Sequence, residues 1–313
     1  MAQTAFVFPG QGSQSIGMMS HWSDYQNLVS DVYQQASEQL GYDLWQLVQQ
    51  GPVETLNQTE KTQPAMLCAG VASWRIWQQS ASNISVEVLA GHSLGEYTAL
   101  VCANSLSLSD AIGLVANRGQ LMQSAVAAGE GSMAAIIGLT DEQVIEVCDA
   151  TVGIVEAVNF NAPGQVVISG KTAAVESAMV LAKEVGAKRA LPLPVSVPSH
   201  CSLMEDAADK LFNQLESINI AMPDIPVIHN QHAQQAENTD EIRLLLKKQL
   251  HQPVRWVATI QLIKSLGITD VVECGPGKIL SGLTRRIDKA MTGHAIFDLE
   301  SLQKTQNNLL ENE

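Results

Sequence analysis

The stretch VEVLAGHSLGEYTALVCA, residues 86–103, places a glycine-flanked serine between an apolar run and a helix-like segment. The run before Gly91 predicts a strand, and the segment from Leu94 predicts a helix. Between them, Gly91, Ser93 and Gly95 fit the pattern G-x-S-x-G. In a nucleophile elbow this turn is strained and leaves almost no room beside the serine, which explains the two glycines. We therefore predict that the turn exposes the Ser93 hydroxyl and aims the N–H of Leu94 at an oxyanion. The alternative is a Gly-rich turn with an incidental serine.

Outward from this turn, short apolar runs alternate with longer stretches of helical spacing. We expect strands over residues 5–8, 86–90, 227–229 and 270–273. Alternation of this kind predicts an α/β fold with a mostly parallel sheet, covered by helices, and ligand sites at the carboxyl ends of its strands.

The structural units become more compact after residue 128. Strands are expected over residues 133–137, 154–159, 165–169 and 189–193, with helices from Thr140 and over residues 172–185. The order β-α-β-β-α-β is that of a ferredoxin-like unit. We therefore predict a small subdomain of residues 129–196, inserted into a larger α/β domain of residues 1–128 and 197–313. The cleft between them is the expected binding site.

The net charge of −14 argues against nucleic acid as a partner. Basic residues are concentrated after residue 170, where 15 Lys and Arg stand against 17 Asp and Glu, compared with 3 against 15 before it. No apolar run approaches the roughly 20 residues of a membrane span, and the N-terminus lacks the pattern of a signal peptide. Five cysteines without a C-x-x-C pair are expected as reduced core thiols. We expect a cytoplasmic globular protein that does not bind membranes.

An activated serine needs a base, and the chain has seven histidines. His200 ends the segment LPLPVSVPSH, whose three prolines favour a stiff, extended chain that could aim the imidazole. His92 adjoins the serine but is the weaker candidate, because neighbouring side chains on a tight turn generally point in different directions. No acidic residue stands out as the group that orients the base, and a backbone carbonyl could serve instead. We predict that His200 is the base.

Arg118 is the only Lys or Arg between Arg75 and Lys171, and it lies in the otherwise uncharged helical stretch AIGLVANRGQLMQ. A guanidinium isolated in such a helix is expected to pair with an anion. That anion is either part of the substrate or a structural partner such as Glu96.

Several further motifs, in order along the chain, resemble those of malonyl-CoA:acyl-carrier-protein transacylases. They are FPGQGSQ at 8–14, GSMAAIIGL at 131–139, NAPGQVVISG at 161–170, VPSH at 197–200 and ECGPGKIL at 273–280. The resemblance spans nearly the whole chain and implies a hydrolase-like core with an inserted ferredoxin-like subdomain. It also implies that the backbone N–H of Gln11 completes the oxyanion hole with that of Leu94, and that the backbone carbonyl of Gln249 steadies His200. Taken alone, the segment around Gln11 is a Gly-rich loop that could equally bind phosphate weakly.

The resemblance further implies that Ser93 carries a malonyl group from malonyl-CoA to the phosphopantetheine thiol of acyl carrier protein. The Arg118 guanidinium would bind the malonyl carboxylate, and no metal or redox cofactor would be required. The closest likeness is to stand-alone bacterial enzymes of fatty-acid synthesis, and a monomer is expected. The acidic carrier protein is expected to dock on a cationic rim formed by some of Lys188, Arg189, Lys278, Arg285 and Arg286.

Three alternatives stay open at this point. Trans-acting acyltransferases of polyketide assembly share the same motifs. A serine hydrolase such as a thioesterase would use the same elbow and base but pass the acyl group to water. A catalytically silent subunit that binds an acyl group or a carrier protein would retain the fold without the chemistry.

Overall fold

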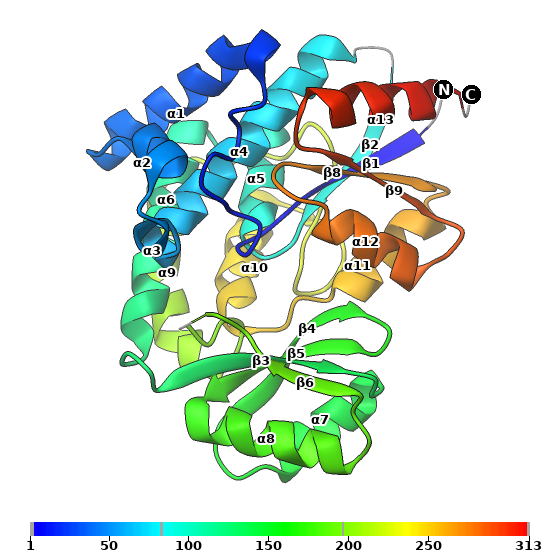
Figure 1. Ribbon diagram of the computed structural model, residues 1–313. Helices are drawn as coiled ribbons and strands as arrows, with labels where there is room; N and C mark the ends of the chain where they lie inside the picture. The colour runs from blue at the N-terminus through cyan, green and yellow to red at the C-terminus, as the bar shows by residue number, and fades with distance from the viewer. Residues whose placement is uncertain (1–2, 82–83, 196, 312–313) are drawn as a thin grey trace.

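The computed structural model describes residues 3–81, 84–195 and 197–311, which form two sheets with helices packed around them (Figure 1). The larger sheet has five strands in the order β7-β2-β1-β8-β9, and all its pairings are parallel. Its strands are β1 (Gln3–Phe8), β2 (Ser85–Gly91), β7 (Val227–Ile228), β8 (Asp270–Cys274) and β9 (Thr292–Ile296). The first four correspond to the predicted strands, and β9 was not predicted.

Both faces of the larger sheet are covered, because successive side chains of a strand point to opposite sides. On β1, Phe6 and Phe8 enter the larger hydrophobic core, where Phe6 meets the ring of Trp74 edge-on at 5.2 Å between centroids. Ala5 and Val7 enter a second core on the other face. Burial on both faces explains why β1 after Thr4 and the second half of β2 are continuously apolar in sequence.

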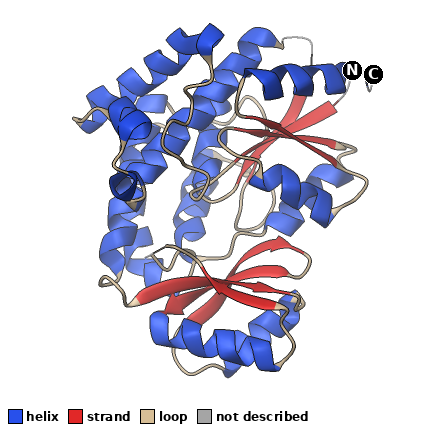
Figure 2. Ribbon diagram, viewed as in Figure 1, coloured by secondary structure: helices blue, strands red, loops and turns tan. Residues whose placement is uncertain are grey.

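Helices supply the layers on the two faces (Figure 2). The larger core is built mainly from α1 (Gln26–Leu40), α2 (Leu44–Gln50), α3 (Val53–Leu56), α4 (Thr59–Ser80), α5 (Leu94–Cys102), α6 (Leu108–Ala125), α9 (Glu205–Ser217), α10 (Thr239–His251) and α13 (Leu299–Glu311). The second core is covered by α11 (Trp256–Ser265) and α12 (Ile279–Ile287). Short 3-10 turns, η1 (Ser23–Tyr25) and η2 (Ser202–Met204), precede α1 and α9.

The smaller sheet is antiparallel, with the strand order β4-β5-β3-β6. Its strands are β3 (Gly131–Ile137), β4 (Val155–Ala162), β5 (Gln165–Lys171) and β6 (Arg189–Pro192), and its helices are α7 (Asp141–Ala150) and α8 (Thr172–Glu184). Both helices pack on it in a hydrophobic core of their own. The chain order is therefore β-α-β-β-α-β, and the predicted α/β fold with a mostly parallel sheet and a ferredoxin-like insertion is confirmed.

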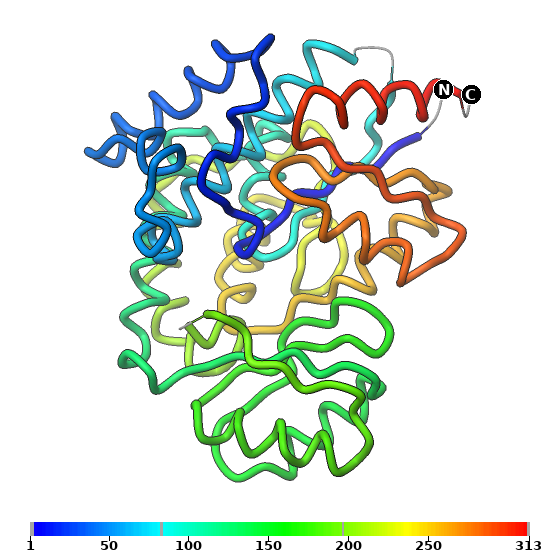
Figure 3. Tube along the Cα trace, viewed as in Figure 1, coloured from blue at the N-terminus to red at the C-terminus, as the bar shows by residue number. Residues whose placement is uncertain are grey.

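The smaller sheet with α7 and α8 forms a small unit, and the rest of the described chain forms a large one. The chain enters the small unit after α6 and returns to the large unit through η2, as the trace in Figure 3 shows. Backbone hydrogen bonds join the two units, from Phe160 N–H to the Val254 carbonyl (3.0 Å) and from Val254 N–H to the Val158 carbonyl (2.8 Å). These bonds fix β4 against the segment before α11. The site described below lies where the two units meet.

The cysteines and the apolar character of the helices can also be compared with the sequence-based expectations. All five cysteines are free and buried, as predicted for core thiols. Among the described residues, no helix combines the length and the apolar character that crossing a membrane requires.

Candidate active site

Ser93 lies on the turn between β2 and α5, with φ 52° and ψ −111°, a conformation that is strained for any residue other than glycine. The flanking glycines are required by space. A Cβ on Gly91 would lie 1.9 Å from the Gly95 carbonyl carbon, and a Cβ on Gly95 would lie 2.0 Å from the Phe8 carbonyl oxygen. The tight strand-to-helix turn predicted from G-x-S-x-G is therefore present.

A buried asparagine holds this turn in place. The Ser93 N–H donates to Asn230 Oδ1 at 2.7 Å, and Asn230 Nδ2 donates to the Gly91 carbonyl at 2.6 Å. The Asn230 N–H donates to Glu96 Oε2 at 3.0 Å, which ties the same residue to the first turn of α5. Asn230 and Glu96 are both fully buried. Asn230 thus bridges both sides of the turn.

The structure brings His200 to the serine, with Nε2 at 2.8 Å from Ser93 Oγ. Its Nδ1 lies 2.6 Å from the backbone carbonyl of Gln249. A carbonyl oxygen only accepts hydrogen bonds, so Nδ1 must carry the proton and Nε2 presents a lone pair to the serine hydroxyl. This is the tautomer that a general base requires. The structure thus places the backbone carbonyl of Gln249 on His200, where many triads have an acid.

His200 is buried, and burial together with the nearby Arg118 cation lowers its pKa to about 3. The imidazole is therefore neutral at physiological pH, as a base must be before it accepts a proton.

Arg118, on α6, is buried and aimed at the serine, with Nη2 at 3.3 Å from Ser93 Oγ. Nη1 donates to Gln63 Oε1 and Nη2 to Gln249 Oε1, each at 2.9 Å. The guanidinium also lies over the Tyr97 ring, 5.4 Å from its centroid. Across the described parts of the chain, no carboxylate forms an ion pair with Arg118.

Arg118 and Glu96 do not form the structural ion pair that was the alternative, because other groups surround the Glu96 carboxylate. Glu96 accepts from His229 Nδ1 at 2.7 Å, from Asn230 N–H, and from Gln249 Nε2 at 2.9 Å. Among the described residues, its hydrogen-bond partners are amide groups and an imidazole, and they occupy both carboxylate oxygens.

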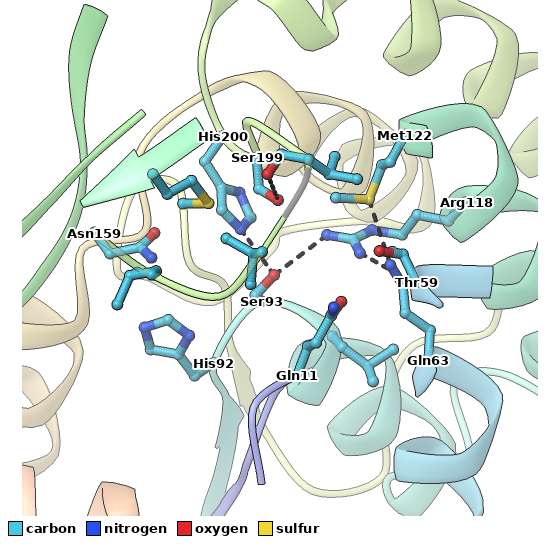
Figure 4. A pocket seen from close by; sticks show the side chains of 15 residues that line it. Gln11, Thr59, Gln63, His92, Ser93, Arg118, Met122, Asn159, Ser199 and His200 are labelled. Carbon is cyan, nitrogen blue, oxygen red and sulfur yellow. Dashed lines mark hydrogen bonds between the residues drawn. The ribbon is translucent and has the colours of Figure 1, made fainter. Parts of the chain in front are cut away.

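A cavity of about 120 Å³ opens above the serine (Figure 4). Figure 4 shows Ser93 between His200 and Arg118, with Gln11 below Ser93 in this view. Leu94 also lines this cavity, and as the first residue of α5 its N–H has no partner within the helix. The lining residues are Gln11, Thr59, Gln63, His92, Ser93, Leu94, Arg118, Met122, Met133, Asn159, Leu193, Val195, Val197, Ser199 and His200.

His92, the weaker candidate for the base, makes other contacts. Its Nε2 lies 2.8 Å from Asn161 Oδ1, and its ring lies against Trp256 with 5.4 Å between centroids. Although both histidines line the cavity, the imidazole of His200 contacts Ser93, whereas the imidazole of His92 contacts Asn161 and Trp256.

Sequence reasoning missed three contributions to this site. Asn230 and Gln63 lie in segments where we identified no motif, and for Gln249 the resemblance indicated only the backbone carbonyl and not the side chain. Each of the three acts through hydrogen bonds with residues more than 50 positions away in sequence. Only their complete burial marks them, and burial of a polar residue is visible in the fold but not in the sequence.

Comparison with known proteins identifies the family of this chain. The family model for the acyl transferase domain matches residues 5–293. The chain is 51% identical to the malonyl CoA-acyl carrier protein transacylase of Haemophilus influenzae, covering 99% of this chain and 100% of that protein. It is 50% identical to the protein of the same name from Escherichia coli K12, covering 95% and 96%.

Solved structures show the same likeness. An acyl carrier protein S-malonyltransferase from Vibrio cholerae is 53% identical with a TM-score of 0.94, covering 96% of this chain and 99% of that one. A malonyl-transacylase in complex with its type II PKS acyl-carrier protein is 48% identical with a TM-score of 0.96, covering 98% and 100%. The resemblance drawn from the motifs is confirmed: this chain belongs to the acyl transferase family, among the malonyl CoA-acyl carrier protein transacylases.

Proposed function

We propose that this chain transfers the malonyl group of malonyl-CoA to the phosphopantetheine thiol of acyl carrier protein, with Ser93 as the nucleophile. The observation that carries the proposal is the convergence of two groups on Ser93 Oγ. One is a neutral imidazole at 2.8 Å, and the other is a buried guanidinium at 3.3 Å that has no counter-ion among the residues the structure describes. The first suits acyl transfer, and the second suits an acyl group that bears a carboxylate.

In the first half-reaction, Ser93 Oγ attacks the thioester carbonyl while His200 Nε2 takes the hydroxyl proton. The Gln249 carbonyl accepts from Nδ1–H and stabilises the resulting imidazolium. The backbone N–H groups of Leu94 and Gln11 receive the developing oxyanion. The intermediate then collapses, the C–S bond breaks, and the proton on Nε2 goes to the sulfur of coenzyme A. A malonyl ester remains on Ser93.

In the second half-reaction, the carrier thiol enters the same cavity and His200 Nε2 takes its proton. The thiolate attacks the ester, and the C–O bond to Ser93 breaks as the proton returns to Oγ. The cycle is therefore ping-pong. Each step uses the chain and its two substrates, so we assign no metal or redox cofactor to it.

Arg118 gives the proposed selectivity for malonyl. In the free site its Nη2 donates to Ser93 Oγ, and we infer that the malonyl carboxylate takes over this donor as a bidentate partner. Acetyl-CoA would offer no anion to the buried guanidinium and should be a poor donor. The relative that is solved with a type II PKS carrier supports a polyketide carrier as the second candidate acceptor.

We place carrier docking on the predicted basic residues, all of which are exposed. Arg286 Nη1 donates to Gln165 Oε1 at 2.7 Å. Gln165 pairs with Ile137 in the small sheet, and Ile137 pairs with Arg189. Arg286 of α12 and Arg189 of β6 therefore lie near the same end of the strands of the smaller sheet, although they are about a hundred residues apart in sequence.

Charge reversal tests this surface. Arg189→Glu combined with Arg286→Glu should raise the KM for carrier protein, more strongly at low salt, with the KM for malonyl-CoA little changed. The matched control is Lys210→Glu on α9, a helix that contacts α6 and α10. An unchanged carrier KM in the double variant would remove the docking site from the proposal.

Intact-protein mass spectrometry tests the function itself. Wild type should form a malonyl adduct with malonyl-CoA and little adduct with acetyl-CoA, Ser93→Ala should form none, and Arg118→Ala should lose the malonyl preference. Release of free malonate without transfer to carrier would mean that water is the acceptor and that the chain is a hydrolase. A wild type that binds but forms no adduct would indicate a catalytically silent subunit.

A further inference from the structure

Within the described part of the chain, the hydrogen bonds of the Arg118 guanidinium all go to uncharged oxygens. Gln63 Oε1 on α4 and Gln249 Oε1 on α10 each accept from it at 2.9 Å, and we call these two side-chain amides the neutral cradle. Gln63 and Gln249 are as fully buried as Arg118 itself. A buried arginine is usually paired with a carboxylate, so its binding by two side-chain amides is unusual and suggests a function.

The neutral cradle also keeps the nearest buried carboxylate away from the guanidinium. Gln249 Nε2 donates to Glu96 Oε2 at 2.9 Å and to the Ser93 carbonyl at 2.8 Å. Both of these oxygens only accept, so they fix the amide with its nitrogen toward Glu96 and its oxygen toward Arg118. Gln249 therefore stands between the anion and the cation and hydrogen-bonds to each.

We propose that Gln63 and Gln249 determine the preference for an anionic acyl group, because they orient Arg118 without neutralising it. This inference rests on the proposed function, in which Arg118 binds the malonyl carboxylate. An internal carboxylate in place of either amide would occupy the guanidinium and repel the carboxylate of the substrate. Gln63 and Gln249 act through Arg118 and are positioning residues, whereas Arg118 touches the substrate.

The test compares two substitutions of Gln63. Gln63→Glu keeps the shape of the side chain but makes it a counter-ion, and Gln63→Met removes the hydrogen bond without adding charge. We measure the rates of Ser93 acylation by malonyl-CoA and by acetyl-CoA, and take their ratio. The ratio should fall about a hundredfold in Gln63→Glu. It should stay within about threefold of wild type in Gln63→Met, even if both rates drop.

A second pair places the charge elsewhere, in case Gln63→Glu does not fold. Met122 lies one turn after Arg118 on α6, lines the same cavity, and its sulfur accepts from Gln63 Nε2 at 3.4 Å. Met122→Glu should reduce the malonyl-to-acetyl ratio, whereas the isosteric Met122→Gln should retain it. Labelling of Ser93 by a fluorophosphonate reports in each variant whether the base and nucleophile are still in place.

The outcomes are distinct. The role of the cradle would be overturned if the malonyl-to-acetyl ratio were preserved in both Gln63→Glu and Met122→Glu, or if it fell equally in Gln63→Met and Met122→Gln. Either result would leave the transferase proposal intact. A wild type with no preference for malonyl-CoA would instead remove the proposed function, and this inference with it. A fall in the carboxylate variants alone supports the neutral cradle.

Discussion

Replacement of Asn230 by alanine is expected to damage both stability and catalysis. The change removes two short hydrogen bonds, from Ser93 N–H and to the Gly91 carbonyl, and leaves two backbone groups buried without a partner. Each such group costs about 1–3 kcal/mol, so the free energy of unfolding should fall by about 2–6 kcal/mol. Because Ser93 is held at positive φ by its surroundings, kcat should fall about a hundredfold with little change in KM.

Urea unfolding followed by fluorescence measures the first effect, and steady-state transfer to carrier protein measures the second. The control is Asn117→Ala, which removes a half-buried side-chain pair with Gln214 and should cost no more than about 1 kcal/mol. A loss below about 1 kcal/mol in Asn230→Ala, together with normal kcat, would refute the view that Asn230 holds the elbow.

Three further predictions follow from the site and the core. Since burial and Arg118 lower the pKa of His200 to about 3, the base gains a proton only far below its usual range. Labelling of Ser93 should therefore stay constant from about pH 8 to about pH 5, and Arg118→Met should move the acid limb upward; a wild-type limb near pH 6.5 would contradict this. Gly95→Ala should abolish folding or activity, as circular dichroism and labelling will show, because its Cβ would lie 2.0 Å from a carbonyl oxygen. Burial raises the pKa of Cys201 to about 11, so N-ethylmaleimide at neutral pH should leave the native protein unmodified and active, and a rapid adduct on mass spectra would argue otherwise.

The sequence predicts the elements of this site that depend on local structure. The elbow is a strand, a turn and a helix within 18 residues, and the glycines record a steric conflict that exists wherever this turn forms. His200 was identified from the prolines before it, and Arg118 from its isolation in an uncharged helix. The β-α-β-β-α-β order also follows from local patterns, whereas the exact limits of the inserted subdomain, residues 129–196, stay a prediction.

Contacts between distant segments could not be predicted in this way. The edge strand β9 contains Thr292 and Gly293 and is only partly buried, so it lacks the apolar run of the central strands. Gln63 lies in the part of α4, residues 62–74, where every residue is buried. Periodicity therefore does not distinguish a polar side chain that binds Arg118 from one that merely fills space. Asn230 follows a two-residue strand, and its partner Ser93 lies 137 positions earlier.

Under the proposed function, the position of Gln249 links catalysis to acyl selectivity. Its backbone carbonyl fixes the tautomer of His200, while its side chain binds Arg118, the Ser93 carbonyl and Glu96. A movement of this end of α10 would therefore shift the base, the elbow and the guanidinium together. Substitutions that relax selectivity by displacing α10 should also slow acylation by every donor. Among the described residues, the side chain of Gln63 hydrogen-bonds to Arg118 and Met122 but not to His200 or Ser93, so substitutions at Gln63 should separate the two effects.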